Sequence, residues 1–199
     1  EEENARAEHE KLKGVPDVTN DKPADARSRG FRSVNGHQIQ RQDAIEGLTG
    51  KESNVKFSNK DTVQGHLKVI DADQLQPSHL NGQRNLSFFI DEAQPKNRTD
   101  NVSSMAAEKI AANINPKEIT GDGSAYQFSA PTVNTHGEVI QGNNRSDDLK
   151  LMYSSPAYSE AQDAYKKYLM DHAEENGIDK DALSKIQHSV SVNELNVPD

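Results

Sequence analysis

The sequence has no cysteine and no tryptophan, and aromatic residues make up only 5% of its 199 residues. The absence of cysteine excludes disulfide bonds, thiolate metal sites and a cysteine nucleophile. Apolar residues account for 32% of the chain, which is little for a core that extends over the full length. We therefore expect the folded core to be concentrated in one part of the chain.

Long hydrophobic runs are missing as well. No segment approaches the roughly 18 consecutive apolar residues of a membrane-spanning helix, and no signal-peptide core is visible. The chain begins with Glu1 rather than Met, so we expect a processed product or an excised piece, from which an upstream signal could be missing. These features favour a cytoplasmic protein that does not bind a membrane.

The balance of charge is acidic, with a formal net charge of −9. An acidic surface argues against nucleic-acid binding over the whole molecule, although a local basic groove remains compatible with it. Acidity that only keeps the protein in solution is the simpler interpretation.

Apolar residues are unevenly distributed along the chain. Residues 1–60 are polar and rich in glycine and proline breaks, and we expect a partly ordered N-terminal arm there, with small strands or one short helix around Gln42–Leu48. Residues 61–199 carry the sharper patterns and are predicted to form the folded domain. Its predicted strands are His66–Ile70, Leu86–Ile90, Pro131–Val133, Glu138–Ile140 and Val190–Val197, and its predicted helices are Ser103–Ile114, Ser146–Tyr153, Ser159–Glu175 and Asp179–His188. This mixed order indicates an α+β or α/β fold.

The segment of residues 130–150 is the most chemically suggestive part of the sequence. Two short apolar runs flank a turn-like Asn134–Gly137, which predicts a β-hairpin. The second run leads into the loop Gly142–Arg145, and Ser146–Asp148 then supplies cap and first-turn residues for a helix. Backbone N–H groups and the dipole at a helix N-terminus attract anions, and Arg145 can fork onto phosphate oxygens. The segment therefore predicts a phosphate site.

Four pieces of the sequence occur in an order that resembles a known family. They are HLKVIDADQLQPSH from His66, QPKNR from Gln94, the helical pattern of residues 103–114, and APTVNTHGEVIQGNNR from Ala130. In this order they resemble the ParB/sulfiredoxin superfamily, and most closely its DdrB-like ParB branch, found in large multidomain proteins of phages and conjugative elements. The resemblance covers about residues 64–178.

The resemblance implies an α+β fold in which a small mixed sheet carries flanking helices. It also implies that a Gly-x-x-Arg loop holds the phosphates of a nucleotide or of a nucleic acid. The phosphate-binding residues expected on this basis are Gly142, Asn143, Asn144, Arg145 and Ser146, with Gln94 and Arg98 as a second wall. Related groups of this fold include CTP-dependent DNA clamps, ATP-using sulfiredoxin, a free-serine kinase and nucleases, so the fold does not decide the function.

Two positions depart from the pattern of that branch. A glycine of its Gly-Asn-Gly-Arg motif is Asn144 here, and because asparagine tolerates positive φ, the loop shape is expected to survive. A motif arginine is Lys96, which keeps the charge but loses the bidentate fork. Both changes leave phosphate binding in place and weaken the case for tight catalytic geometry.

Other residues have alternative interpretations. Glu138 is the main candidate for a catalytic carboxylate, with Asp147 as the alternative in an enzyme, but a strand glutamate more often faces solvent. Arg145 could instead pair with Asp147 or Asp148, and these two carboxylates could hold Mg²⁺ beside a phosphate or simply complement the helix dipole. Ser78 and His79 could form a nucleophile–base pair, although adjacent loop residues rarely point together. No cluster has the spacing of a zinc site, so no metal ligands are predicted.

The sequence thus predicts a ParB-like domain that binds a nucleotide or DNA and acts in DNA processing within a larger polypeptide of a mobile element. The implied cofactor is a nucleoside triphosphate with Mg²⁺. Two alternatives stay open: an NTP-using enzyme or nuclease of the same fold, and a protein-interaction module with a vestigial pocket.

Overall fold

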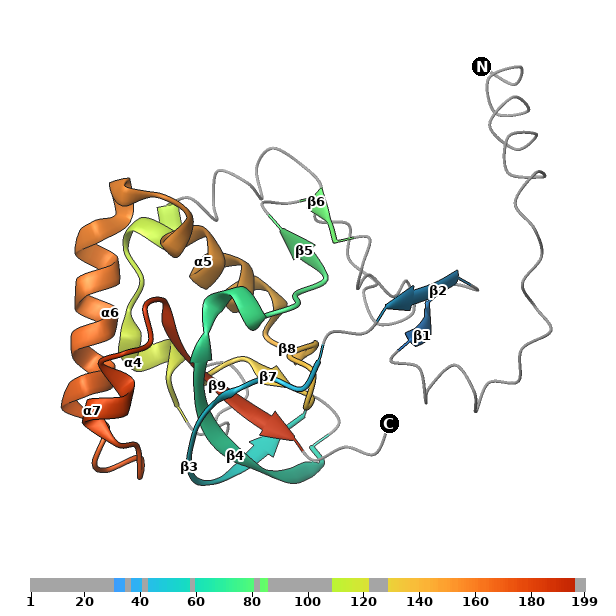
Figure 1. Ribbon diagram of the computed structural model, residues 1–199, viewed down its shortest axis with the longest axis horizontal. Helices are drawn as coiled ribbons and strands as arrows, with labels where there is room; N and C mark the ends of the chain where they lie inside the picture. Colours follow the sequence, from blue (N-terminus) through green and yellow to red (C-terminus); the bar gives the residue numbers. More distant parts are fainter. Residues whose placement is uncertain are drawn as a thin grey trace, which may run out of the picture.

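A five-stranded sheet forms the centre of the described part of the chain (Figure 1). The computed structural model describes residues 31–34, 37–40, 43–57, 60–80, 83–85, 109–121 and 129–195. The strands of the central sheet, in spatial order, are β3 (Gly47–Lys56), β4 (Thr62–Asp71), β9 (Ser189–Leu195), β7 (Thr132–Val133) and β8 (Val139–Gln141). The β7–β9 pair is parallel and the others are antiparallel, which confirms the predicted mixed sheet.

Two short hairpins lie outside this sheet. One consists of β1 (Phe31–Val34) and β2 (His37–Gln40), and the other of β5 (His79–Leu80) and β6 (Gln83–Arg84). Strand β5 follows β4 closely in the chain. It contacts α5 (Asn143–Ser154), the helix that carries the predicted phosphate site.

The central position of β9 explains its composition. Strands β4 and β7 flank β9 on its two edges. Along β9, apolar and polar residues alternate, and side chains on both faces of the strand are buried: Val190, Val192, Ser189, Ser191 and Asn193. The edge strands of the sheet approach each other, since the Gln141 side-chain amide donates to the Lys56 carbonyl over 3.2 Å. The sheet is therefore strongly curled.

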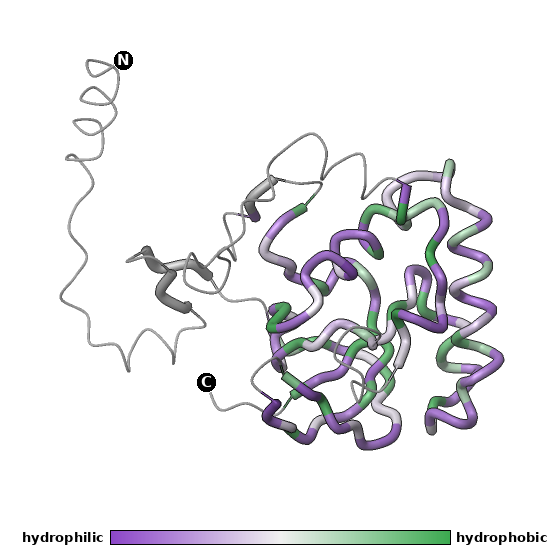
Figure 2. Tube along the Cα trace, turned by 180° about the vertical axis from the view of Figure 1, so that it is seen from behind, coloured by the Kyte–Doolittle hydropathy of each residue, from purple (hydrophilic) through white to green (hydrophobic). Residues whose placement is uncertain are grey.

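Helices cover one side of the sheet (Figure 1). They are α4 (Pro116–Ile119), α5 (Asn143–Ser154), α6 (Ser159–Asp171) and α7 (Lys180–Leu183), with the 3-10 helices η2 (Ala72–Gln74) and η4 (Pro156–Tyr158). Apolar residues follow the inner side of this layer (Figure 2), and Tyr165, Leu149 and Met152 are completely buried in the core. The hydroxyl group of Tyr165 accepts a hydrogen bond from the Ser191 N–H, which joins α6 to β9.

Most predicted elements are present with shifted ends. The hairpin of β7 and β8 and the last strand are confirmed, and β4 starts four residues earlier than expected. For residues 30–65, small strands or one short helix around Gln42–Leu48 were expected. The strands are confirmed as β1, β2 and β3, and the helix is wrong, since residues 43–46 are not helical and β3 begins at Gly47. The last predicted helix shortens to α7, because Asp179 caps it and turns follow Leu183. The predicted strand Leu86–Ile90 lies outside the described residues.

A close backbone contact locks the β7–β8 hairpin against η2. Gly137 has φ +76°, and a Cβ there would lie 2.2 Å from the Gln74 carbonyl oxygen. Gly177, after α6, also has positive φ, +69°, but the nearest atom to its Cβ would be 3.6 Å away. The two glycines share a backbone conformation and differ in the space around them.

Gly137→Ala is therefore expected to destabilise the protein clearly more than Gly177→Ala. Both variants suffer the left-handed conformation, at about 1–2 kcal/mol, and only Gly137→Ala adds a backbone clash, at about 1–3 kcal/mol. Urea unfolding of the two variants measures the difference. Equal losses would contradict the close packing of the hairpin on η2.

Candidate phosphate and ligand pocket

Helix α5 begins at Asn143, three residues earlier than the sequence indicates. Gly142 is the N-cap, with φ +90° and ψ 32°, and Asn143 to Arg145 form the first helical turn. The prediction of a loop over Gly142–Arg145 with a helix from Ser146 is therefore wrong. The cause is the left-handed conformation of Gly142, which turns the chain from β8 directly into the helix. A glycine N-cap contributes no capping side chain.

Arg145 lies over this helix start. A Cβ on Gly142 would lie 2.9 Å from the Arg145 Nη2 and 3.1 Å from its Nε, so the guanidinium group packs against the glycine. The Nη1 atom donates to the carbonyl oxygen of Ser129 and, over 3.1 Å, to its hydroxyl group. Ser129 is completely buried. The structure thus fixes a cation beside the positive end of the α5 dipole.

The other residues of the predicted loop differ in their surroundings. Asn143 is buried and its Oδ1 accepts a hydrogen bond from the Ser78 N–H over 2.7 Å. The Ser146 hydroxyl is also buried and donates to the Gly142 carbonyl over 3.2 Å. Asn144 is exposed and does not have positive φ. The expectation that Asn144 must tolerate positive φ is therefore wrong, because the left-handed residue is Gly142.

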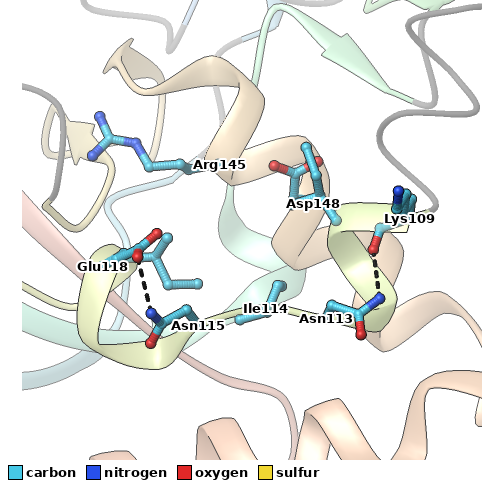
Figure 3. Close-up of a pocket in the computed structure, with 9 residues that line it drawn as sticks. Lys109, Asn113, Ile114, Asn115, Glu118, Arg145 and Asp148 are labelled. Carbon is cyan, nitrogen blue, oxygen red and sulfur yellow. Dashed lines mark hydrogen bonds between the residues drawn. The ribbon is translucent and has the colours of Figure 1, made fainter.

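A pocket of about 470 Å³ opens beside Arg145 (Figure 3). Its apolar lining comes from Ile110, Ile114 and Ile119, and its other lining residues are Lys109, Asn113, Asn115, Glu118, Arg145 and Asp148. The segment of residues 109–119 forms one wall and α5 the other. Two hydrogen bonds stiffen the first wall, from Asn115 to Glu118 over 2.9 Å and from Asn113 to the Lys109 carbonyl over 3.0 Å.

Asp148 is the most unusual group of this pocket. Its side chain is only 7% exposed, and burial, together with the neighbouring charge of Asp147, raises its pKa from the usual 3.8 to about 7. Arg145 and Asp148 lie three residues apart and therefore project from the same side of α5. From the sequence, Asp148 was expected to complement the helix dipole, to hold Mg²⁺ or to pair with Arg145. The residues around Asp148 in the sequence form no apolar pattern from which its burial in a pocket could be predicted.

Comparison with known protein families matches residues 58–196 to the ddrB-like ParB superfamily domain. The chain belongs to this family. No curated protein and no solved structure matches the chain. Membership supports a ParB-type, DNA-related role, and it does not name the ligand of this pocket.

Of the remaining candidate residues Glu138, Gln94 and Arg98, the structure describes only Glu138. The Glu138 carboxylate, on the approach to α5, accepts a hydrogen bond from the Asn134 side chain over 2.7 Å, within the hairpin turn. Its catalytic role stays a prediction. Gln94 and Arg98 lie outside the described residues, so the second wall that they were expected to form stays a prediction too.

Ser78 and His79 contact each other, contrary to expectation. The Ser78 hydroxyl lies 3.0 Å from the His79 Nδ1, and the two side chains are 1% and 5% exposed. Strand β5, which begins at His79, contacts α5, and the Ser78 N–H donates to Asn143 at the start of that helix. Their burial makes this contact part of the support for α5 rather than an accessible nucleophile.

One group among the described residues has ligand atoms close enough for a metal ion. Atoms of Asp71, Asp73 and His188 lie within 4.8 Å of one another. The Asp71 carboxylate already accepts hydrogen bonds from the N–H groups of Asp73 and His188, at 3.1 and 3.2 Å, as the cap of η2. Capping accounts for the cluster. In the described part of the chain, no helix is long and apolar enough to cross a membrane.

Asn143→Ala is expected to lower the free energy of unfolding by about 1–3 kcal/mol, because it leaves the buried Ser78 N–H without an acceptor. Asn143→Asp keeps the acceptor oxygen and places negative charge at the helix N-terminus, so it should retain most of the stability. Urea unfolding distinguishes the two. An Asn143→Ala variant as stable as the wild type would show that the contact does not support α5.

Asp148 predicts a pH dependence of stability. Its pKa is about 7 in the folded protein and near 3.8 when unfolded, so between these values the folded state binds more protons. The free energy of unfolding should therefore fall as pH rises from about 4 to about 7, by a few kcal/mol, at about 1.4 kcal/mol per pKa unit. Asp148→Asn should remove this slope. Urea titrations at a series of pH values measure it, and equal slopes in both proteins would refute the assignment.

Proposed function

We propose that this ParB-like domain binds the phosphate group of a nucleotide or a nucleic acid at the start of α5. The observation that carries the proposal is the position of Arg145 over Gly142, where the guanidinium group and the N-terminal end of the helix dipole act on the same space. Arginine suits this role because its planar fork matches phosphate oxygens.

The pocket beside Arg145 gives the rest of the ligand a place to bind. Its volume of about 470 Å³ lies in the range of small-molecule sites, and three isoleucines with a few polar groups line it, as in many such sites. Lys109 adds a second cation at the opposite end of the lining (Figure 3). The net charge of −9 does not prevent local anion binding, because charges beyond about 10 Å are screened at physiological salt.

The wider proposal is that the domain serves DNA processing in a larger cytoplasmic protein of a mobile element, with a nucleoside triphosphate and Mg²⁺ as the natural ligand. Membership of the ddrB-like ParB family supports the DNA-related part of this proposal. Mg²⁺ would enter with the phosphates, since it keeps several waters and needs few protein carboxylates.

A thermal-shift panel with inorganic pyrophosphate, the four nucleoside triphosphates, ADP and a short single-stranded DNA, each with and without Mg²⁺, tests the proposal. A ligand at 100 times its dissociation constant adds about 2.7 kcal/mol of stability, so a binding partner should raise the melting temperature clearly. Arg145→Ala is expected to weaken binding by at least about tenfold, since a charge-assisted hydrogen bond contributes about 1.5–3 kcal/mol.

Lys185→Ala is the matched control, because it removes one exposed cation that does not line the pocket. Circular dichroism and urea unfolding test whether Arg145→Ala still folds without its hydrogen bonds to Ser129. No shift of the wild-type protein with any ligand would refute the proposal. A shift that survives Arg145→Ala would refute its location.

A further inference from the structure

The carboxyl group of Asp148 lacks a counterpart within the described residues. It is 7% exposed and lines the pocket, and no described residue forms a hydrogen bond or an ion pair with it. A carboxyl group that is largely withdrawn from water and has no hydrogen-bond partner in the protein is costly to keep, and Asp148 lines the pocket, where a ligand can reach it. A ligand in the pocket would supply the partner.

Arg145 and Asp148 occupy different positions along α5, so they can contact different parts of one ligand. Arg145 is in the first turn, and Asp148 follows three residues later, which places it about 4.5 Å further along the helix axis on the same side. An anionic group at Arg145 therefore leaves Asp148 beside a different part of the same ligand. Figure 3 shows Asp148 between Arg145 and Lys109, above the wall of residues 109–119.

The facing wall is suited to a flat ring. Ile110 is an exposed large apolar side chain, 49% accessible, and it lines the pocket together with Ile114 and Ile119. Apolar surface of this kind gains from covering by a planar base. A volume of about 470 Å³ is large enough for one nucleotide.

We propose that the pocket binds a single nucleotide, with the base against the isoleucines and with Asp148 as the residue that selects the base. This inference rests on the phosphate site at Arg145. An ionised carboxylate only accepts hydrogen bonds, whereas a protonated one also donates. The ionised form therefore matches guanine, whose edge presents adjacent N–H donors. The protonated form matches adenine or cytosine, which present an N–H beside a ring acceptor.

Burial and the neighbouring charges allow the Asp148 carboxyl group to change its protonation state near neutral pH. On its own helix they are Asp147 and Arg145, and on the facing wall they are Lys109 and Glu118. Burial is the larger influence and Asp147 the second, and both favour the protonated carboxyl group. The preferred base should therefore depend on pH.

Isothermal titration with GMP, AMP, CMP, UMP and inorganic pyrophosphate, at pH 6 and pH 8.5, tests the inference. At pH 8.5 the wild type should bind GMP at least about tenfold more tightly than UMP, the equivalent of one charge-assisted hydrogen bond. At pH 6 this preference should fall and AMP or CMP should gain. Asp148→Asn should lose the pH dependence of base choice while it keeps its affinity for pyrophosphate.

Two further variants make the test decisive. Ile119→Trp fills the pocket without touching the carboxyl group, and it should lose the mononucleotides but bind pyrophosphate. Asp163→Asn, on the exposed face of α6, is the matched charge control and should bind like the wild type.

The outcomes separate this inference from the phosphate site. Mononucleotides that bind no better than pyrophosphate, a base choice that ignores pH and Asp148→Asn, or binding of DNA strands alone would overturn the inference and leave phosphate binding intact. Absence of binding by pyrophosphate, mononucleotides and DNA together would refute both.

Discussion

The contacts of residues 71–80 are the constraint on which the candidate site depends. The N–H of Gln76 donates to the Gly137 carbonyl over 2.9 Å, and the N–H of Val139 donates back to the Gln76 carbonyl over 3.1 Å, so the segment holds the hairpin that leads into α5. The same segment holds α5 itself, because Asn143 receives the Ser78 N–H and the Lys150 ammonium group donates to the carbonyls of Ala72 and Leu75, each over 3.0 Å. Arg145 is therefore oriented by a strand connection more than sixty residues away in sequence.

This support explains why α5 can carry so many polar groups. Asn143, Ser146, Asp147 and Asp148 are all buried, although a helix usually buries an apolar stripe. Asn143 and Ser146 have hydrogen-bond partners within the fold. Burial, which disfavours the charged form, lowers the pKa of Lys150 and raises that of Asp148. The stability lost at Asp148 is compatible with a binding function, because strained or poorly satisfied groups concentrate at such sites.

The sequence predicts the general fold well and the start of α5 poorly. Alternation of apolar residues identified β4, the β7–β8 hairpin and β9, because their inward positions depend on local pattern. The predicted start of the helix was wrong because Ser146-Asp147-Asp148 resembles a helix cap. These residues are instead buried within α5, and the N-cap is Gly142. No local pattern in the sequence marks Gly142 as left-handed, because glycine adopts positive and negative φ about equally. The pocket wall of residues 109–119 was missed for the same reason: no local pattern brings that segment to α5.

The departures from the ParB-like pattern have unequal consequences in this geometry. Asn144 replaces a glycine, but it is exposed and has an ordinary helical φ, so the substitution costs little. Gly142 could not be replaced in the same way, because its φ is +90° and any Cβ would push into the Arg145 guanidinium group. The glycine that the site requires is thus the first of the motif, and it is retained. In this chain the first glycine is left-handed, and this conformation lets Arg145 fold back over the start of α5.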